Sequence, residues 1–209
     1  MKSIKIGIFD YSAGNLGSLK SAIHRIGFEN VIITRDFSTL EHVDCIILPG
    51  VGSFGYCMEI LNETQDATSF FKNFLEKNDK LLVGICIGMQ LLGNTSEESD
   101  KCRGLGLISF DVKKIKVNSD QRLPHVGWNS IDNIPKNLKV SDGVYDLYFD
   151  HSYKLVCESD LVLSNTFYGE EIPAIIKKEN IVGIQFHPEL SGQIGSDMLK
   201  HIISEELSC

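Results

Sequence analysis

The sequence predicts an α/β fold built on an open, twisted and mostly parallel sheet that is flanked by helices and carries an antiparallel extension. In the first half, apolar runs of strand length alternate with segments whose apolar residues recur at helical spacing. In the second half, β-rich pieces separated by polar turns replace this alternation. The chain has 209 residues with no internal repeat or linker, so we expect a single domain over residues 1–209.

The first half of the chain predicts the parallel part of the sheet. Continuous apolar runs, typical of strands covered on both faces, mark strands at residues 4–9, 31–34, 45–48 and 81–85. Apolar residues at helical spacing indicate one helix from Leu16 to Ile26, another around residues 70–75 and a third at residues 87–92. Strands and helices therefore alternate along this half.

The second half predicts the antiparallel part. We expect an antiparallel extension on the sheet, made of β-rich pieces at residues 106–117 and 126–131. Later strands are expected at residues 147–149, 161–167, 172–177 and 181–186. The last helix covers about residues 192–206, because Ile194, Met198 and Ile202 fall on one side of it.

Charge and hydropathy exclude several classes of partner. Lys and Arg number 20 and Asp and Glu 28, a formal charge of −8, and the two signs are interspersed. This argues against binding to a nucleic-acid backbone. The apolar run near the N-terminus is far shorter than a signal sequence or the roughly 20 residues needed to cross a bilayer. We therefore expect a cytoplasmic protein that binds neither nucleic acid nor membrane.

The cysteines indicate neither a metal site nor disulfides. There are six, none in a CxxC pair or in a Cys/His cluster at the spacing of metal ligands. A chain of this length with ordinary apolar content needs no covalent cross-links, so reduced thiols are expected. We expect no metal and no cofactor.

Residues 84–88, Gly-Ile-Cys-Ile-Gly, have the form of a nucleophile elbow with cysteine in place of serine. The motif lies where an apolar strand ends and a helix begins, and its two glycines permit a sharp turn. Such a turn exposes the thiol of Cys86 above the sheet, and the start of the helix favours the thiolate form. Taken alone, the motif also fits a buried core cysteine beside a glycine turn.

His187-Pro188-Glu189 supplies the groups that a thiol nucleophile needs, which are a base and a residue that orients the base. We expect Pro188 to hold the backbone extended, so that Glu189 reaches the imidazole of His187. Taken alone, the three residues also fit a strand that ends in a surface turn. The presence of Cys86 upstream favours the catalytic interpretation.

A glycine-rich loop at residues 49–55, Pro-Gly-Val-Gly-Ser-Phe-Gly, follows a predicted strand and can direct backbone N–H groups at a developing oxyanion. We expect Val51 and Gly52 to contribute to this oxyanion hole together with the N–H of Ile87, next to the nucleophile. The alternatives are an ordinary loop before a helix and a phosphate cradle. A P-loop would also carry lysine and Ser/Thr, which are absent here.

These three motifs, with Gly-Met-Gln-Leu at residues 88–91 after the elbow, resemble the class I glutamine amidotransferases in order and spacing over nearly the whole chain. The resemblance implies a three-layer, flavodoxin-like fold. It also implies that Cys86, His187 and Glu189 form a catalytic triad that hydrolyses glutamine. Three further segments, at residues 10–16, 124–129 and 148–153, look like the glutaminase subunits of imidazole glycerol phosphate synthases.

This second resemblance implies a heterodimer in which the chain makes ammonia and a (β/α)₈ barrel cyclase subunit uses it in histidine biosynthesis. L-glutamine is the implied substrate. The residues implied to bind glutamine are Gly50, Gly52, Gln90, Ser152 and Tyr153. The residues implied to face the partner are Asn15, His125, Trp128, Asn129 and Tyr148.

One position departs from the family. Lysine and then serine usually follow the His-Pro-Glu, whereas this chain has Leu190 and then Ser191. Similar glutaminases supply ammonia to a sugar amidotransferase in surface polysaccharide biosynthesis, and this stays open as the alternative acceptor. Two other classes of protein fit the motifs less well. A cysteine peptidase or chaperone-like relative would carry histidine where this chain has Ile87, and a silent binding subunit would have lost a triad residue.

The remaining conspicuous residues have structural interpretations. His24 and His42 are expected on helix or loop surfaces, and Cys45 and Cys157 in or near the core. The charged residues 97–101 predict a solvated loop. For His125 and His151, structural support and partner contact both stay open.

Overall fold

The apolar runs of the first half become the centre of one sheet. The structure is a computed structural model that describes residues 4–207 except residues 15, 64, 78 and 139–143. The strands predicted at residues 4–9, 31–34, 45–48 and 81–85 are confirmed. The described strands are β1 Lys5–Phe9, β2 Asn30–Thr34, β3 Cys45–Leu48, β4 Leu81–Ile85, β5 Thr95–Ser96, β6 Ser99–Arg103, β7 Phe110–Lys114, β8 His125–Ile131, β9 Tyr145–His151, β10 Tyr153–Cys157, β11 Val162–Tyr168, β12 Glu170–Lys178 and β13 Ile181–Ile184.

Several helix ends carry recognisable capping signals. Asp36 caps α2 by accepting a hydrogen bond from the Ser38 N–H, and Asp66 caps α4 in the same way through Ser69. Gly27 follows α1 in the left-handed conformation that ends many helices. The described helices are α1 Leu16–Arg25, α2 Phe37–Leu40, α3 Phe54–Leu61, α4 Ala67–Leu75, α5 Ile87–Gln90 and α6 Gly192–Glu206, with 3₁₀ turns η1 Lys136–Leu138, η2 Ser159–Leu161 and η3 Pro188–Leu190.

Among the described residues, nine strands form the main sheet in the order β2-β1-β3-β4-β13-β12-β11-β8-β9. The five strands from β2 to β13 are parallel. From β13 onward each neighbouring pair is antiparallel. The predicted fold class is therefore confirmed, including an antiparallel extension that contains β8, which was expected at residues 126–131.

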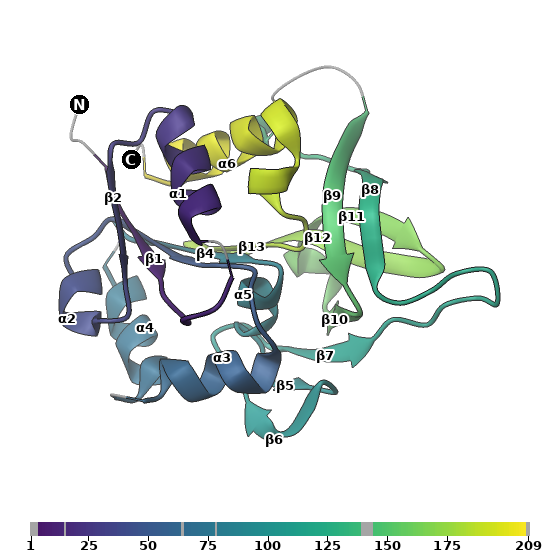
Figure 1. The fold of residues 1–209 in the computed structure, drawn as a ribbon, viewed down its shortest axis with the longest axis horizontal. Coiled ribbons are helices and arrows are strands. Elements are labelled where there is room, and N and C mark those ends of the chain that lie inside the picture. Colours follow the sequence, from purple (N-terminus) through teal and green to yellow (C-terminus); the bar gives the residue numbers. More distant parts are fainter. Residues whose placement is uncertain (1–3, 15, 64, 78, 139–143, 208–209) are drawn as a thin grey trace.

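Helices cover both faces of the sheet, because successive side chains of a strand point to opposite sides. In β3, Ile47 belongs to the apolar cluster beneath α1 and α6, whereas Ile46 and Leu48 belong to the cluster beneath α2, α3, α4 and α5. All four residues of β3 and all five of β4 are buried, as expected for central parallel strands. Figure 1 shows α1 and α6 on one side and α2, α3 and α4 on the other.

A second, smaller sheet was not predicted. Its order is β10-β7-β5-β6, and it contains the region that was expected to extend the main sheet at residues 106–117. That prediction is wrong because Phe110 and Val112 of β7 bury their side chains in the cluster beneath α2 to α5. The strand β7 therefore lies across one face of the fold, pairing with β10 and β5.

Three neighbouring parallel strands end at the same edge of the main sheet. They are β3, β4 and β13, and they are followed by Pro49, Cys86 and Gln185, respectively. Ligands of open α/β sheets bind outside the carboxyl ends of the strands. The topology therefore brings together the three motifs that the sequence analysis selected.

The structure also describes the cysteines and tests the helices for membrane-spanning length. Five cysteines in the described part of the chain are free thiols, and Cys209 lies outside it. Cys45 is fully buried and Cys157 is half-buried, as predicted. No helix in the described ranges is long and apolar enough to span a membrane.

Candidate active site

Cys86 occupies a sharp turn between β4 and α5. Its backbone has φ +50° and ψ −109°, a conformation that side chains rarely adopt and that recurs at nucleophile elbows. The flanking glycines are required by space. A Cβ on Gly84 would lie 2.6 Å from the Gly88 carbonyl oxygen, and a Cβ on Gly88 would lie 2.0 Å from that of Leu48. The turn is therefore held by close backbone packing.

His187 and Glu189 form a hydrogen-bonded pair in which Nδ1 of His187 lies 3.0 Å from Oε1 of Glu189. The expectation of an extended backbone here is wrong, because Pro188 begins the 3₁₀ turn η3 and Glu189 reaches back to the imidazole from within it. Ser191 holds the turn in place. Its hydroxyl donates to the His187 carbonyl at 2.5 Å and accepts from the Tyr148 N–H at 2.9 Å.

The segments that follow β3, β4 and β13 meet without space for another side chain. A Cβ on Gly50 would lie 2.8 Å from Cε1 of His187 and 2.9 Å from Cβ of Cys86. Burial alone would lower the pKa of His187, but its contacts with Cys86 and Glu189 raise that pKa to about 11. The imidazole is therefore charged at neutral pH. A cysteine beside a charged histidine is typical of thiol nucleophiles.

A comparison with protein families agrees with this geometry. The family model described as "Glutamine amidotransferase class-I" matches residues 8–204. The chain belongs to the class I glutamine amidotransferase family. The resemblance stated from the motifs is thereby confirmed over nearly the whole chain.

Relatives with curated names narrow the comparison within this family. A protein of Bacillus cereus (strain G9842) named imidazole glycerol phosphate synthase subunit HisH is 40% identical, over 94% of this chain and 92% of its own length. The protein of the same name from Methanocaldococcus jannaschii is 40% identical, over 95% and 98%. Another from Methanococcus maripaludis, named subunit HisH 2, is 40% identical, over 96% and 99%.

Solved structures share the amidotransferase fold at low identity. One titled "Crystal structure of glutamine amidotransferase" superimposes with a TM-score of 0.76 at 18% identity, covering 98% of this chain and 99% of its own. A structure of PurLQS from Thermotoga maritima superimposes with a TM-score of 0.71 at 20% identity, covering 97% and 99%. The same fold is therefore built from sequences that differ at most positions.

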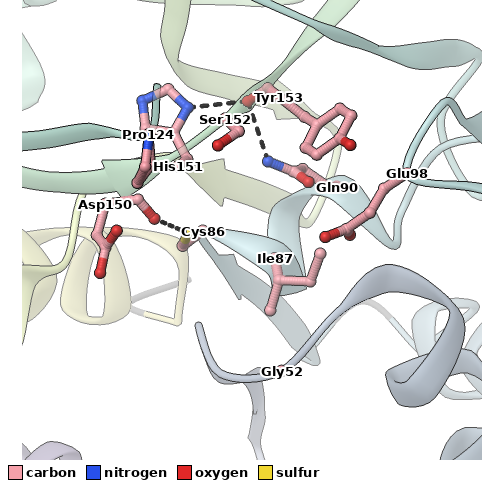
Figure 2. A pocket seen from close by; sticks show the side chains of 10 residues that line it. All are labelled: Gly52, Cys86, Ile87, Gln90, Glu98, Pro124, Asp150, His151, Ser152 and Tyr153. Carbon is pink, nitrogen blue, oxygen red and sulfur yellow. Dashed lines mark hydrogen bonds between the residues drawn. The ribbon is translucent and has the colours of Figure 1, made fainter. Parts of the chain in front are cut away.

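A pocket of about 200 Å³ opens beside Cys86 (Figure 2). It is lined by Gly52, Cys86, Ile87, Gln90, Glu98, Pro124, Asp150, His151, Ser152 and Tyr153. The pocket thus brings together four of the five residues predicted to bind glutamine. The fifth, Gly50, lies behind Cys86 and His187, where its small size permits their close approach.

Gln90 connects two walls of the pocket. Its side-chain amide donates to the Tyr153 carbonyl at 3.3 Å and to Oε1 of Gln185 at 3.2 Å. The amide of Gln185 in turn donates to the sulfur of Cys86 at 3.5 Å. Figure 2 shows the Gln90 side chain directed at the Tyr153 carbonyl. Gln185 was not selected from the sequence, although it immediately precedes the Phe-His-Pro-Glu motif.

Glu98 lines the pocket and was also missed by the sequence analysis. Residues 97–101 were expected to form a solvated loop, and this is wrong for residues 99–101, which begin β6, whereas Glu97 and Glu98 form an exposed turn before it. The Glu98 carboxylate accepts a hydrogen bond of 2.7 Å from the Phe54 N–H, at the start of α3, and lines the pocket. A single carboxylate within a charged run carries no sequence signal that separates it from a surface residue.

The glycine-rich loop lies against the pocket with its Val51–Gly52 peptide. The Val51 carbonyl accepts a hydrogen bond from the thiol of Cys57 at 3.2 Å, and Gly52 has φ +100°. Gly52 and Ile87 line the pocket. The N–H of Ile87 belongs to the first turn of α5, where a helix offers no carbonyl partner. Both segments predicted for the oxyanion hole are therefore adjacent to Cys86.

The residues predicted to face a partner are only partly at the surface. Trp128 is 60% exposed and packs edge-on against Tyr148, with ring centroids 6.2 Å apart. Val126, Phe167 and Leu190 are exposed apolar side chains as well. His125 is 3% exposed, so its predicted place in an interface is corrected, because the ring is buried between Phe149 and Tyr168. Asn15 lies outside the described residues.

Proposed function

We propose that this chain, as one domain, is a cytoplasmic glutaminase subunit that hydrolyses L-glutamine to glutamate and ammonia. It passes the ammonia to the cyclase subunit of imidazole glycerol phosphate synthase in histidine biosynthesis. The observation that carries the chemistry is Cys86 on a strained elbow beside a charged His187, at the wall of a pocket. The names of relatives that are 40% identical over nearly their full length support the pathway.

In the first half-reaction, the thiolate of Cys86 attacks the side-chain amide carbon of glutamine and a C–S bond forms. The carbonyl oxygen becomes an oxyanion, which the N–H of Ile87 and an N–H of the loop at Val51 and Gly52 stabilise. His187 then donates its proton to the amide nitrogen. The C–N bond breaks, and ammonia leaves a γ-glutamyl thioester on Cys86.

In the second half-reaction, water attacks the thioester while His187, now neutral, accepts a proton from it. A second oxyanion forms in the same hole and collapses with cleavage of the C–S bond. Glutamate leaves, and the thiolate of Cys86 and the charged His187 are restored. Glu189 orients the imidazole through the 3.0 Å hydrogen bond to Nδ1 and does not itself take up the proton.

The pocket has groups that match the other end of glutamine. The carboxylate of Glu98 faces the pocket and complements the α-ammonium group of the substrate. Gln90, Ser152 and Tyr153 form the wall beside it. We propose that these residues hold the amino-acid end while Cys86 attacks the amide end.

The exposed apolar face around Trp128 supports docking of the synthase partner, since Val126, Phe167 and Tyr148 lie on or beside the same strands. Leu190, 49% exposed at the end of η3, replaces the usual lysine next to this face. The alternative acceptor is a sugar amidotransferase, which would use the same glutaminase chemistry. The relatives' names favour the cyclase, a (β/α)₈ barrel with which the chain forms a heterodimer.

Steady-state glutaminase kinetics of the chain alone and with the purified cyclase subunit test this proposal. Gly50 and Gly52 flank Val51 and tolerate both orientations of its peptide. If docking turns an N–H into the hole, the acceptor-loaded cyclase raises kcat by about 10²–10³, the usual effect of one oxyanion donor. The KM for glutamine changes less.

Two outcomes would count against parts of the proposal. Full activity without a partner would show that the hole is already formed and that Val51 is no gate. No association with the cyclase, together with activation by a sugar amidotransferase, would replace the proposed acceptor. Identification of the protein that co-purifies with the native chain decides between these partners.

A further inference from the structure

Two buried histidines link the exposed apolar face to the pocket. Nδ1 of His125 lies 3.1 Å from Nε2 of His151, and Nδ1 of His151 lies 2.8 Å from the Tyr153 carbonyl oxygen. At the other end, the side-chain nitrogen of Asn129 lies 3.2 Å from Nε2 of His125 and 3.0 Å from the Phe167 carbonyl oxygen. The proposed reaction uses neither histidine.

These contacts determine where every hydrogen must lie. A carbonyl oxygen only accepts, so Nδ1 of His151 and the amide nitrogen of Asn129 are donors. Burial lowers the pKa of His125 to about 4 and that of His151 to about 3, so both rings are neutral at physiological pH and carry one hydrogen each. The Nδ1–H of His125 therefore donates to Nε2 of His151. Nε2 of His125 in turn accepts a hydrogen bond from the side-chain amide of Asn129.

The rings are also fixed in orientation. His125 stacks between Phe149 and Tyr168, with interplanar angles of 19° to both. His151 is 5% exposed and occupies the end of β9, where the chain turns through Ser152 into β10. That turn forms the wall of the pocket opposite the glycine-rich loop at residues 49–55, here called the oxyanion loop. Figure 2 shows the His151 ring directed at the Tyr153 carbonyl.

We propose that Asn129, His125 and His151 are positioning residues that fix the Tyr153 carbonyl, and with it the wall of the glutamine pocket, through a one-directional hydrogen-bond chain. The Tyr153 carbonyl is shared, because Gln90 also donates to it. The hydrogen-bond chain thus sets the position of Gln90 as well as that of the wall. This inference rests on the proposed function, since it assigns the pocket to glutamine.

The hydrogen-bond chain begins near the surface, at Asn129. Asn129 bonds the carbonyl of Phe167, whose side chain is 68% exposed beside the face around Trp128. Donors then point from Asn129 inward to Tyr153 without reversal. Replacing the Asn129 amide by a carboxylate removes both of its donated hydrogen bonds and places an acceptor opposite Nε2 of His125. We therefore expect the single hydrogen of that neutral ring to move from Nδ1 to Nε2, which removes the donor to His151 and breaks the hydrogen-bond chain.

Imidazole nitrogen NMR of the full-length chain tests the arrangement directly. His125 and His151 should both carry hydrogen on Nδ1 and none on Nε2, whereas His42, whose side chain is 76% exposed, provides an internal reference for a solvent-accessible ring. Asn129→Asp should protonate Nε2 of His125, while the matched change Asn73→Asp, on the exposed face of α4, should leave both rings unaltered. Hydrogen on Nε2 of either buried ring in the wild type would overturn the inference.

Glutamine binding to the unreactive Cys86→Ala chain, measured by calorimetry, tests the positioning role. His151→Leu in this background should weaken binding roughly tenfold, the effect of leaving buried hydrogen-bonding groups unpaired. His151→Asn should restore binding to within about threefold, because its amide nitrogen can replace Nδ1 as donor. The control His42→Leu, at a side chain 76% exposed, should bind like the parent.

The outcomes separate this inference from the proposed function. Equal binding by a folded His151→Leu chain, or binding by His151→Asn as weak as that of the leucine variant, would overturn the positioning role alone. No glutamine binding by the folded Cys86→Ala parent would overturn the proposed function as well. If His151→Leu does not fold, Asn129→Asp against Asn73→Asp decides, and equal binding by these two overturns the role.

Discussion

The two walls of the pocket are positioned by different means. On one wall, the carboxyl ends of β3, β4 and β13 place the oxyanion loop, Cys86 and His187 through main-chain geometry. On the other, side chains of Gln90, Glu98 and His151 bond to main-chain groups and so hold the turn at residues 150–153 and the start of α3. The difference teaches that the proposed reacting groups follow from the topology, while the proposed recognition of substrate depends on individual side chains.

This comparison predicts that changes on the first wall affect turnover, whereas changes on the second affect binding. The prediction is open to disproof at single residues on either wall. The following variants are ordered from the largest expected effect to the smallest.

Cys86→Ala should lower glutamine turnover by at least about 10⁴-fold in the presence of the partner, because no other group on that wall can form the thioester. Glutamate release by the folded variant measures it. Cys157→Ala, at a half-buried thiol remote from the pocket lining, provides the control and should retain activity. Substantial hydrolysis by the Cys86 variant would remove this residue as nucleophile.

Glu189→Gln should lower kcat by roughly 10²–10⁴ with little change in glutamine binding, by analogy with the orienting carboxylate of other triads. An amide can keep the contact to Nδ1 of His187 but loses the charge that helps to raise the pKa of this histidine. Because the pKa of His187 should then be lower, the pH dependence of kcat should change together with the value of kcat. An unaltered partner-activated rate would exclude Glu189 from the triad.

Glu98→Gln should raise the KM for glutamine by about 10–100-fold and leave kcat within a few-fold, because a charge-assisted hydrogen bond to the α-ammonium group is lost. An amide oxygen can still accept from the Phe54 N–H, so α3 should stay in place. The exposed Glu63→Gln, which only loses a surface ion pair with Arg35, serves as the control. A selective loss of kcat instead would contradict the division between the two walls.

The free energy of unfolding should decrease on acidification, because His125 and His151 on the second wall are buried as neutral rings. In the unfolded chain, histidines titrate near pH 6.5, whereas burial lowers the pKa of His125 to about 4 and of His151 to about 3 in the fold. The unfolded state then binds more protons between these values. The free energy of unfolding falls as the pH drops below about 6.5, by up to about 1.4 kcal/mol per pH unit for each histidine.

Denaturant unfolding between pH 7 and pH 4 checks this. His151→Asn, which cannot titrate there, should show a shallower loss of stability than the wild type. Parallel pH dependences of the two proteins would mean that His151 does not remain neutral in the fold.

The first wall could be predicted from the sequence for a physical reason. Buried parallel strands are continuous apolar runs, and Gly84 and Gly88 mark the turn because no side chain fits there. Residues next to the ends of neighbouring strands must then meet. The strands β3 and β4 and the helix α6 were predicted with the bounds that the structure shows. The catalytic roles themselves stay predictions until the variants are measured.

The second wall could not be predicted to the same extent. β5 has two residues, too few for any periodicity, and β7 belongs to a sheet whose pairing depends on distant β10. Glu98 and the pair His125 and His151 act through contacts between segments far apart in the sequence. No local pattern distinguishes such residues from surface charges or core histidines.

The Ser191 hydroxyl bonds to the main chain of both η3 and β9. Two adjacent positions, 190 and 191, should therefore differ in their tolerance to substitution. Ser191 is 2% exposed and its hydroxyl bonds both partners, whereas the side chain of the neighbouring Leu190 is 49% exposed. A library of variants selected for glutaminase activity should accept many residues at position 190 and few at position 191. A charge at the rim of the site can therefore be gained or lost at position 190 without altering the geometry of His187.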